Sequence, residues 1–444
     1  MSGAIRDGGT IGSPPPSTPP SSVAALARHL PSSAGEEIAP DRPVAVVIGA
    51  GPAGLMAAET LSAAGWAVDV YERMPSVGRK FLMAGRGGLN LTHSEPLPAF
   101  LARYGPEAER LRPAIAAFPP AALVAWAEGL GQPTFAGSSG RVFPRALKAS
   151  PLLRAWLARL SAQGVRFHTR HRWLGWTDDG ALRFETPEGE RALPQPEATI
   201  LALGGASWPR LGSDGAWAST LQDQGVEVAA FRPANAGFTI AWSDTFRERF
   251  AGQPVKPLAL TFARTRVRGE ATVTRYGLEG GATYALSRPL REETLRTGQA
   301  RLWLDLAPDL REDALTDKLA APRPGLTLSN RLRKAANLSP VAVGLLREAH
   351  GVQLPTDAPA LARAIKGAPL TITGMQGLDR AISSAGGLAL SAIDADQQLT
   401  AVPGVYAAGE MLDWEAPTGG YLLQACFATG RAAALAVIAR LGAA

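Results

Sequence analysis

Residues 43–72 read PVAVVIGAGPAGLMAAETLSAAGWAVDVYE, and this stretch decides the fold of the chain. It opens with Pro43 to Ile48 (PVAVVI), a short valine-rich apolar run of the kind that forms a buried parallel strand. Three glycines follow at positions 49, 51 and 54 in the pattern G-x-G-x-x-G. In a dinucleotide-binding turn the first glycine makes the tight turn, the second lets the backbone approach a pyrophosphate, and the third allows the helix to pack closely.

The residues after these glycines complete the pattern. The segment LMAAETLSAAG predicts a helix that ends at Gly65, whose N-terminus offers free N–H groups to phosphates. A second strand, Ala67 to Tyr71, ends in Glu72, where an acid accepts a hydrogen bond from a ribose hydroxyl. Strand, glycines, helix, strand and acid in this order predict a Rossmann-type α/β domain that binds a dinucleotide.

The far end of the chain indicates which dinucleotide it is. Val405 to Ala408 is a predicted strand that runs into Gly409-Glu410, and Thr418-Gly419-Gly420 then opens an apolar helix. In many flavoproteins a late strand ends in Gly-Asp, and the carboxylate lies against the ribityl chain. The N-terminus of the next helix points at the flavin, and the helix dipole there favours the anionic reduced flavin. Glu410 stands where Asp is commoner, so its contact is expected to reach further or to run through water. We therefore expect FAD.

A third segment, Thr199 to Gly205 (TILALGG), is expected to return the chain to the cofactor. No second G-x-G-x-x-G follows a strand, so we expect no dedicated NAD(P)H domain. NAD(P)H would then be a transient electron donor that binds over the flavin or in the inserted region.

The loop from Gly78 to His93 (GRKFLMAGRGGLNLTH) combines glycines with basic and polar side chains, which suits a wrap around a pyrophosphate and the flavin edge. The alternative is a surface loop with solvated charges. Together these segments give the predicted cofactor-binding residues Gly49, Ala50, Gly51, Pro52, Ala53, Gly54, Glu72, Arg73, Arg79, Lys80, Gly85, Asn90, Leu91, Gly204, Gly205, Gly409, Glu410, Gly419 and Gly420.

Composition limits the class of protein. The 444 residues are 46% hydrophobic and 19% charged, which favours two or three packed domains. Charged residues interrupt the apolar C-terminal stretch, so we expect a core helix there and no membrane span.

The single cysteine, Cys426, excludes an intramolecular disulfide and fits the cytoplasm. We expect its side chain to be buried and inert, and we expect no metal site. A net charge of +6 is compatible with structured RNA as a partner but does not require one.

The pattern along the chain divides it into segments. Residues 1–42 are rich in Ser, Pro and Gly and predict a disordered tail, or reflect a misplaced start codon. The FAD-binding domain is expected over 43–234 and 385–444, split by a β-barrel-like insertion at 235–310 with a return strand at 367–384. A small helical domain is expected at 311–366, with Ser329 and Ser339 as helix N-caps.

Four regions together resemble one known family: GAGPAGLMAAETL (49–61), GRKFLMAGRGGLNLTHSEP (78–96), GRVFPRALKASPLLRAW (140–156) with LGGASWPRLGSDG (203–215), and VPGVYAAGEMLDWEAPTGGYLLQACFATG (402–430). The chain resembles the FAD-binding flavoproteins called aminoacetone-oxidase-like or bile-acid-reductase-like, which include a dihydrouridine synthase acting on ribosomal RNA. The resemblance spans everything after residue 43 and implies the same split flavin domain. Members commonly carry Arg-Cys where this chain has Gly88-Leu89, so no role of that cysteine is carried over.

The resemblance implies an enzyme, an FAD-dependent oxidoreductase. The leading hypothesis is NAD(P)H-dependent reduction of a C=C bond conjugated to a carbonyl in a small-molecule or nucleotide substrate, including a uridine in ribosomal RNA. The alternatives are an amine oxidase of the aminoacetone type and an RNA-binding flavoprotein with structural FAD.

The catalytic residue is open between Arg86, Asn90, His93 and Tyr421. Arg141 and the run Ser207-Trp208-Pro209-Arg210 are expected at the substrate mouth, or else pack and carry surface charge. Asp413, Trp414 and Glu415 are expected to face the flavin.

Overall fold

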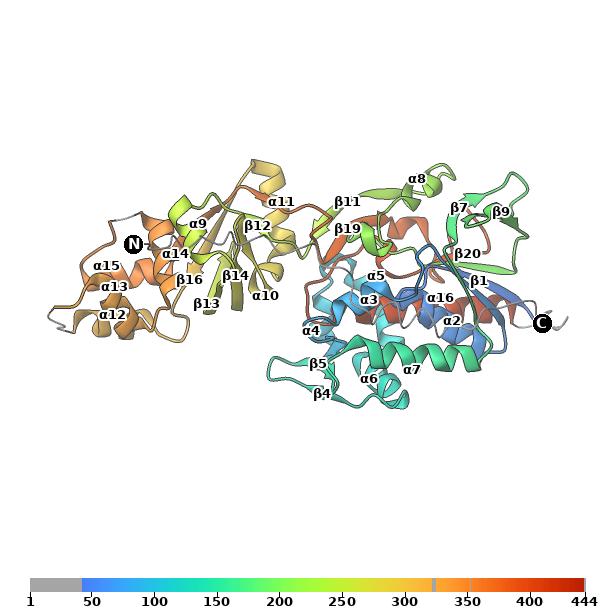
Figure 1. Cartoon of the computed structure of the whole chain (residues 1–444), viewed down its shortest axis with the longest axis horizontal. Coiled ribbons are helices and arrows are strands. Elements are labelled where there is room, and N and C mark those ends of the chain that lie inside the picture. Colours follow the sequence, from blue (N-terminus) through green and yellow to red (C-terminus); the bar gives the residue numbers. More distant parts are fainter. Residues whose placement is uncertain (1–41, 322–324, 352, 443–444) are drawn as a thin grey trace, which may run out of the picture.

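The computed structural model describes residues 42–321, 325–351 and 353–442. Figure 1 shows two units side by side along the long axis of the molecule. The unit at the right contains the two ends of the described chain and is called here the Rossmann unit. The unit at the left consists of residues 235–382 and is called the insert. Each unit has its own hydrophobic core.

The centre of the Rossmann unit is a parallel sheet in the strand order β20-β10-β1-β2-β6. Its strands are β1 (Val44–Ile48), β2 (Ala67–Glu72), β6 (Arg166–Thr169), β10 (Ala198–Leu201) and β20 (Val405–Ala407). Because both faces are covered, valine and alanine fill the central strand, and Ala45 and Val47 are fully buried. The predicted Rossmann-type α/β fold is confirmed, with its first and last strands drawn from opposite ends of the chain.

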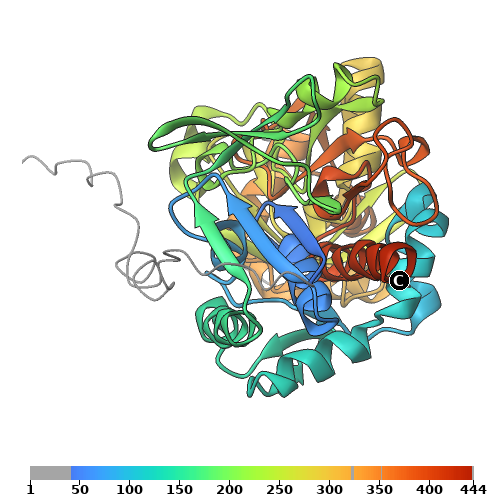
Figure 2. The same ribbon diagram turned by 90° about the vertical axis from the view of Figure 1, so that its right-hand side faces the viewer.

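Two long helices cover one face of this sheet (Figure 2). They are α2 (Pro52–Ala63), which follows the glycine turn, and α16 (Tyr421–Leu441). They approach closely at Gly430, where a β-carbon would overlap the backbone of Ala53. Among the described residues α16 alone is long and apolar enough to span a membrane by length and composition, but 56% of its most apolar window is buried inside the protein. That burial supports a core helix.

Smaller elements complete the Rossmann unit. The sheets are β3-β5-β4, β7-β8-β9 and the pair β11-β19, formed by β3 (Thr92–His93), β4 (Thr134–Ala136), β5 (Arg141–Pro144), β7 (Arg172–Trp176), β8 (Leu182–Thr186), β9 (Gly189–Leu193), β11 (Val228–Ala234) and β19 (Ser383–Leu388). The remaining helices are α3 (Arg79–Ala84), α4 (Leu97–Ala102), η2 (Gly105–Glu107), α5 (Ala108–Ala117), α6 (Pro120–Gly129), α7 (Ala149–Ala162), η3 (Pro209–Leu211), α8 (Trp217–Gln222), η4 (Leu390–Ala392) and η5 (Gly409–Met411).

The insert is built on one sheet in the order β17-β16-β13-β14-β15-β12-β18. Its strands are β12 (Phe238–Thr239), β13 (Pro254–Phe262), β14 (Thr265–Val273), β15 (Gly277–Glu279), β16 (Ala300–Asp305), β17 (Ala368–Ile372) and β18 (Gly374–Met375). The expected barrel-like insertion is an open sheet in the described residues, because β17 and β18 stand at its two ends.

Helices of the insert pack on this sheet and share its hydrophobic core. They are α9 (Asp244–Phe250), α10 (Gly281–Tyr284), α11 (Ser287–Thr297), α12 (Glu312–Ala320), α13 (Leu328–Ala336), α14 (Pro340–His350) and α15 (Ala358–Lys366). The predicted cap Ser339 is confirmed, since its side chain accepts a hydrogen bond from the Ala342 N–H. The prediction for Ser329 is wrong because α13 begins earlier, with Thr327 as its cap.

Two connections join the insert to the Rossmann unit, and they lie side by side as β11 and β19 (Figure 1). Asn235, at the start of the insert, holds them together: its side-chain amide donates to the Ser383 hydroxyl at 2.8 Å and to the Ala416 carbonyl at 2.8 Å. Its oxygen accepts from the Thr418 N–H at 3.1 Å. The entrance of the insert is thus fixed to the loop that precedes α16.

Candidate active site

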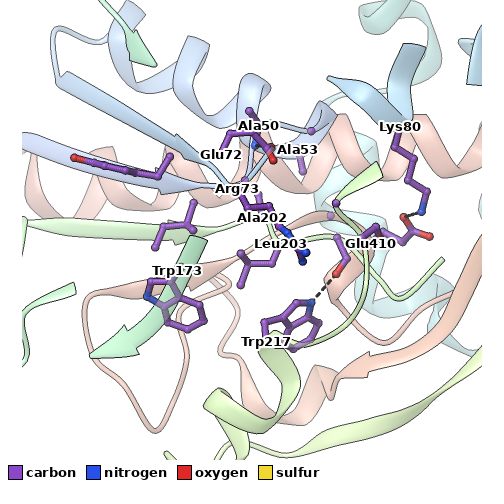
Figure 3. A pocket seen from close by; sticks show the side chains of 18 of the residues that line it. Ala50, Ala53, Glu72, Arg73, Lys80, Trp173, Ala202, Leu203, Trp217 and Glu410 are labelled. Carbon is purple, nitrogen blue, oxygen red and sulfur yellow. Dashed lines mark hydrogen bonds and ion pairs between the residues drawn. The ribbon is translucent and has the colours of Figure 1, made fainter. Parts of the chain in front are cut away.

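A pocket opens at the carboxyl ends of β1, β2 and β10 (Figure 3). Its walls are segments that the sequence placed at a cofactor, together with side chains from β7 and α8. The lining includes Gly49, Ala50, Gly51, Pro52, Ala53, Glu72, Arg73, Arg79, Lys80, Trp173, Leu203, Gly204, Asp214, Trp217, Gly409, Glu410 and Cys426. The structure therefore brings together predicted residues that are far apart in the sequence.

The three glycines of the first turn meet different surroundings. Gly49 has a positive φ of 105°, and a β-carbon there would overlap the carbonyl of Ala202. At Gly54 a β-carbon would overlap the carbonyl of Gly49. Gly51 differs, because a β-carbon there would meet no protein atom within 4 Å and would project into the open pocket. The protein itself does not require glycine at position 51, whereas a ligand whose phosphates lie against the backbone does.

Glu72 is held in place by the backbone at the edge of this pocket. Its Oε2 accepts a hydrogen bond from the Ala50 N–H at 3.0 Å, and its Oε1 accepts one from the Met74 N–H at 2.8 Å. Burial raises the pKa of the carboxyl group. The side chain thus ties the glycine turn to the end of β2, the place where a ribose is expected.

Two ion pairs cross the pocket. Lys80 Nζ lies 2.6 Å from Glu410 Oε2 and donates to the Ser207 hydroxyl at 2.6 Å (Figure 3). Arg73 pairs with Asp214 at 2.5 Å on the other side. Sequence analysis selected Lys80, Glu410 and Arg73 but missed these pairings, because the partners are hundreds of residues apart or carry no local signature.

The basic loop leaves buried polar atoms without a partner. Arg79 Nε and Asn90 Oδ1 are both buried, and neither forms a hydrogen bond with any residue that the structure describes. An unsatisfied buried polar group costs free energy. The combination of these atoms, the free space at Gly51 and the Lys80 cation fits a bound dinucleotide with a charged pyrophosphate.

Other predicted glycines lie where elements of the Rossmann unit pack closely. Gly420 has a φ of 94°, and a β-carbon there would overlap the backbone of Thr92. Gly85 likewise contacts Ala149, and Gly205 contacts Ser384. Leu91 is buried beside Thr92. These glycines allow close packing of the loop, while Gly204 and Gly409 also line the pocket.

His93 and Tyr421 are stacked with ring centroids 5.5 Å apart, but their polar atoms are occupied. His93 Nδ1 accepts from the Glu95 N–H at 3.1 Å and Nε2 lies 3.0 Å from the Ser139 carbonyl, which favours the neutral Nε2–H tautomer. The Tyr421 hydroxyl donates to Glu95 at 2.6 Å, and burial with this hydrogen bond raises its pKa. Arg86 is exposed.

Arg141, expected at the substrate mouth, lies where the two units meet. Its strand β5 pairs with β3, so Arg141 is opposite His93 and one residue from the Thr92–Gly420 contact. A β-carbon at Gly281 of the insert would be 3.6 Å from its guanidinium. Ser207 is fully buried, Trp208 is half-buried and Arg210 is exposed.

Tyr284, which sequence reasoning missed, lies in the helix of the insert that approaches Arg141 through Gly281. It stands three residues after Gly281 in α10, hence on the same side of that helix. Burial, and then the nearby Glu279 carboxylate, raise its pKa to about 12, so the hydroxyl stays protonated at neutral pH. The only local signal for it was an aromatic residue after a glycine pair.

The expectation that residues 413–415 face the flavin is wrong for Trp414 and Glu415. The Trp414 indole is buried and donates to the Gly409 carbonyl at 2.9 Å. Glu415 pairs with Arg291 of α11 at 2.7 Å, because a buried carboxylate needs a cation. Asp413 accepts from the Gly386 N–H at 3.1 Å, and burial raises its pKa.

Comparison with known proteins gives the family. Residues 43–436 match the family described as the HI0933-like protein Rossmann domain. The chain belongs to this family. Leu89, where related sequences are expected to carry cysteine, is fully buried here.

Two curated relatives match along nearly their whole length. The 3-dehydro-bile acid delta(4,6)-reductase of Clostridium scindens is 25% identical over 89% of this chain and 98% of its own. The ribosomal RNA dihydrouridine synthase of Haemophilus influenzae is 23% identical over 88% of this chain and 98% of its own.

A solved structure shares the fold. The 3-ketosteroid delta1-dehydrogenase of Sterolibacterium denitrificans has a TM-score of 0.50 at 13% identity, covering 89% of this chain and 99% of that one. The protein is an FAD-dependent oxidoreductase. The glycine turn, Glu72 and Lys80 all line the pocket, and this lining fits FAD. The contact of the start of α16 with the flavin stays a prediction.

Proposed function

We propose that this oxidoreductase reduces a C=C bond conjugated to a carbonyl, with NAD(P)H as the electron donor. The names of both curated relatives describe this type of reaction, a delta(4,6)-reductase acting on a 3-dehydro compound and a synthase of dihydrouridine. In each case a double bond in conjugation with a carbonyl group becomes saturated.

The observation that carries the proposal is the position of Arg141, whose guanidinium reaches Gly281 of the insert where the two units meet. No hydrogen bond or ion pair joins the Arg141 guanidinium to another residue in the described ranges. The guanidinium is therefore available to bind a substrate carbonyl oxygen. It would stabilise the negative charge that develops on that oxygen when the alkene accepts a hydride at its β carbon.

FAD, when bound, supplies the hydride. The Arg141 guanidinium donates hydrogen bonds to the substrate carbonyl and fixes its orientation. The Tyr284 hydroxyl, protonated at neutral pH because its pKa is about 12, delivers the proton to the α carbon. His93 and Tyr421 position the wall around the site, since their polar atoms already bond to Ser139, Glu95 and the backbone.

The test is an anaerobic visible spectrum of the FAD-loaded protein, titrated separately with NADH, NADPH and aminoacetone. Loss of the flavin absorption with a nicotinamide, followed by reoxidation with a 3-keto-4-ene steroid or with uridine-containing RNA, would establish the reductase. Bleaching by the amine alone, with peroxide released in air, would replace it with an amine oxidase. A flavin that neither donor reduces would indicate a structural cofactor.

Two variants test the assigned residues. Arg141→Gln should lower kcat/KM with the carbonyl substrate by about 100-fold or more, the cost of losing one oxyanion donor, while reduction by NAD(P)H proceeds as before. Tyr284→Phe should slow reoxidation by the same substrate by about 100-fold. Equal rates for variants and wild type would remove both residues from the reaction.

A further inference from the structure

One face of the insert carries four arginines around an exposed tryptophan. The arginines are Arg264, Arg266, Arg268 and Arg301, and the tryptophan is Trp303. We call these five residues the arginine–tryptophan face. All five side chains are exposed, and Trp303 retains 45% of its accessible surface. Trp303 thus offers a flat aromatic surface to the solvent.

The strand register places Arg266, Arg268, Arg301 and Trp303 on one side of the sheet, and Arg264 lies in the turn between β13 and β14. In β16 the buried Leu302 and Leu304 point into the core of the insert, so Arg301 and Trp303 point to the opposite face. Thr261 of β13 lies opposite both Trp303 of β16 and Arg266 of β14. Arg266, Thr261 and Trp303 therefore form a row across three neighbouring strands.

The acids on this face neutralise only part of its charge. Arg266 pairs with Asp305 at 2.6 Å, but Asp305 is nearly fully buried and is shared with Lys366 at 2.7 Å. Arg268 pairs with Asp309. Arg264 and Arg301 have no carboxylate partner among the described residues. The Arg301 guanidinium lies 5.6 Å from the centroid of Trp303, where it extends the flat surface of the ring.

The insert also accounts for the charge excess of the whole chain. Residues 235–382 contain 21 Lys and Arg against 14 Asp and Glu, while the rest of the sequence contains 24 against 25. The basic composition is therefore a property of the insert, and it is not needed by the cofactor pocket in the Rossmann unit.

We propose that the arginine–tryptophan face binds an unpaired segment of RNA, with a base stacked on Trp303 and phosphates on the surrounding arginines. Arginines alone would suit any polyanion, but a flat aromatic ring between them is the arrangement that binds single-stranded nucleic acid. The face is remote in sequence from Arg141 and the glycine turn. The inference goes beyond the proposed reaction and does not require that the RNA be the substrate.

The experiment uses FAD-loaded full-length protein and a fluorescein-labelled, unstructured RNA of about 16 nucleotides, the upper range for one binding module. Fluorescence anisotropy is measured at several KCl concentrations. We expect binding that weakens as salt rises, because phosphate neutralisation releases counterions. Trp303→Ala should weaken binding by about five-fold or more with little change in the salt dependence, and Trp303→Phe should retain most of the affinity.

Arg301→Gln should reduce the slope of log Kd against log salt by roughly one. Arg183→Gln, an exposed arginine in β8 of the Rossmann unit, is the matched control and should change neither quantity. The visible spectrum of each variant reports whether FAD and the fold are retained.

Three results would overturn the proposal: no binding at low salt, equal affinity for Trp303→Ala and wild type, or equal competition by polyglutamate and by unlabelled RNA. The last would assign the face to an acidic protein. None of these results depends on flavin reduction by NAD(P)H, so failure here and failure of the proposed reaction are distinguishable.

Discussion

Replacing Gly51 by alanine should separate the fold from cofactor binding. The backbone of Gly51 has φ −85° and ψ −175°, which alanine adopts without strain, and its β-carbon would meet no protein atom. Gly51 is also the N-cap of α2. Replacing a glycine by alanine lowers the conformational entropy of the unfolded chain, which raises the free energy of unfolding by about 0.4–1 kcal/mol. Alanine is a poorer N-cap than glycine, which lowers the free energy of unfolding by about the same amount. The free energy of unfolding of the FAD-free protein should therefore change by less than about 1 kcal/mol.

The same methyl group would occupy space that the cofactor needs. Overpacking by one such group costs about 1–3 kcal/mol, which corresponds to a Kd for FAD raised about 5- to 150-fold. Isothermal titration of the FAD-free protein with FAD measures the Kd, and urea unfolding measures stability. Gly49→Ala is the control with the opposite profile, because its positive φ and the overlap with Ala202 should destabilise the FAD-free protein itself. An unchanged Kd for Gly51→Ala would refute the placement of the pyrophosphate at this turn.

Three further predictions concern the loop before α16 and its surroundings. Arg291→Met leaves the buried Glu415 only the more distant Arg288, 3.4 Å away, and should lower the free energy of unfolding in urea by about 3 kcal/mol. Arg296→Met on the exposed side of α11 should change the free energy of unfolding by less than about 1 kcal/mol, and similar values for the two variants would contradict the buried pair. Because burial raises the pKa of Asp413 above its unfolded value of 3.8, its ionisation destabilises the folded state, so Asp413→Asn should be more stable than wild type at pH 8. The advantage of the variant should shrink as the pH falls through the folded pKa of Asp413 and should be lost below the unfolded value of 3.8; an advantage that persists unchanged below pH 3.8 would contradict the raised pKa. Burial raises the pKa of Cys426 to about 12, so iodoacetamide should alkylate it far more slowly at pH 8 in the folded protein than in urea; equal rates would show an accessible thiolate.

Local sequence patterns predicted most of the Rossmann unit because the residues of each motif lie close together along the chain. The glycine turn, the strand before it and Glu72 all lie within residues 43–72, and steric and hydrogen-bonding demands fix each residue type. The late strand before Gly409 could be identified for the same reason. Whether these residues contact FAD as expected remains a prediction.

The pairings across the site could not be predicted in this way. Lys80 and Glu410 are joined by the fold alone, and Gly281 of the insert lies beside Arg141 of β5 only because the fold brings the two units together there. The alternation in β16 indicated a strand but not which of its faces would stay uncovered, so Trp303 was not singled out. Glu415 was misassigned because its cation, Arg291, comes from a helix more than a hundred residues earlier.

The point where the chain leaves and re-enters the Rossmann unit has an evolutionary consequence. Ala234 and Ser383 are partners in the β11–β19 ladder, so the two ends of the insert are adjacent. A segment whose ends already touch can be lengthened, shortened or exchanged without moving the host strands. An exchange of the insert at these two points would therefore leave the strands that hold the cofactor pocket in place.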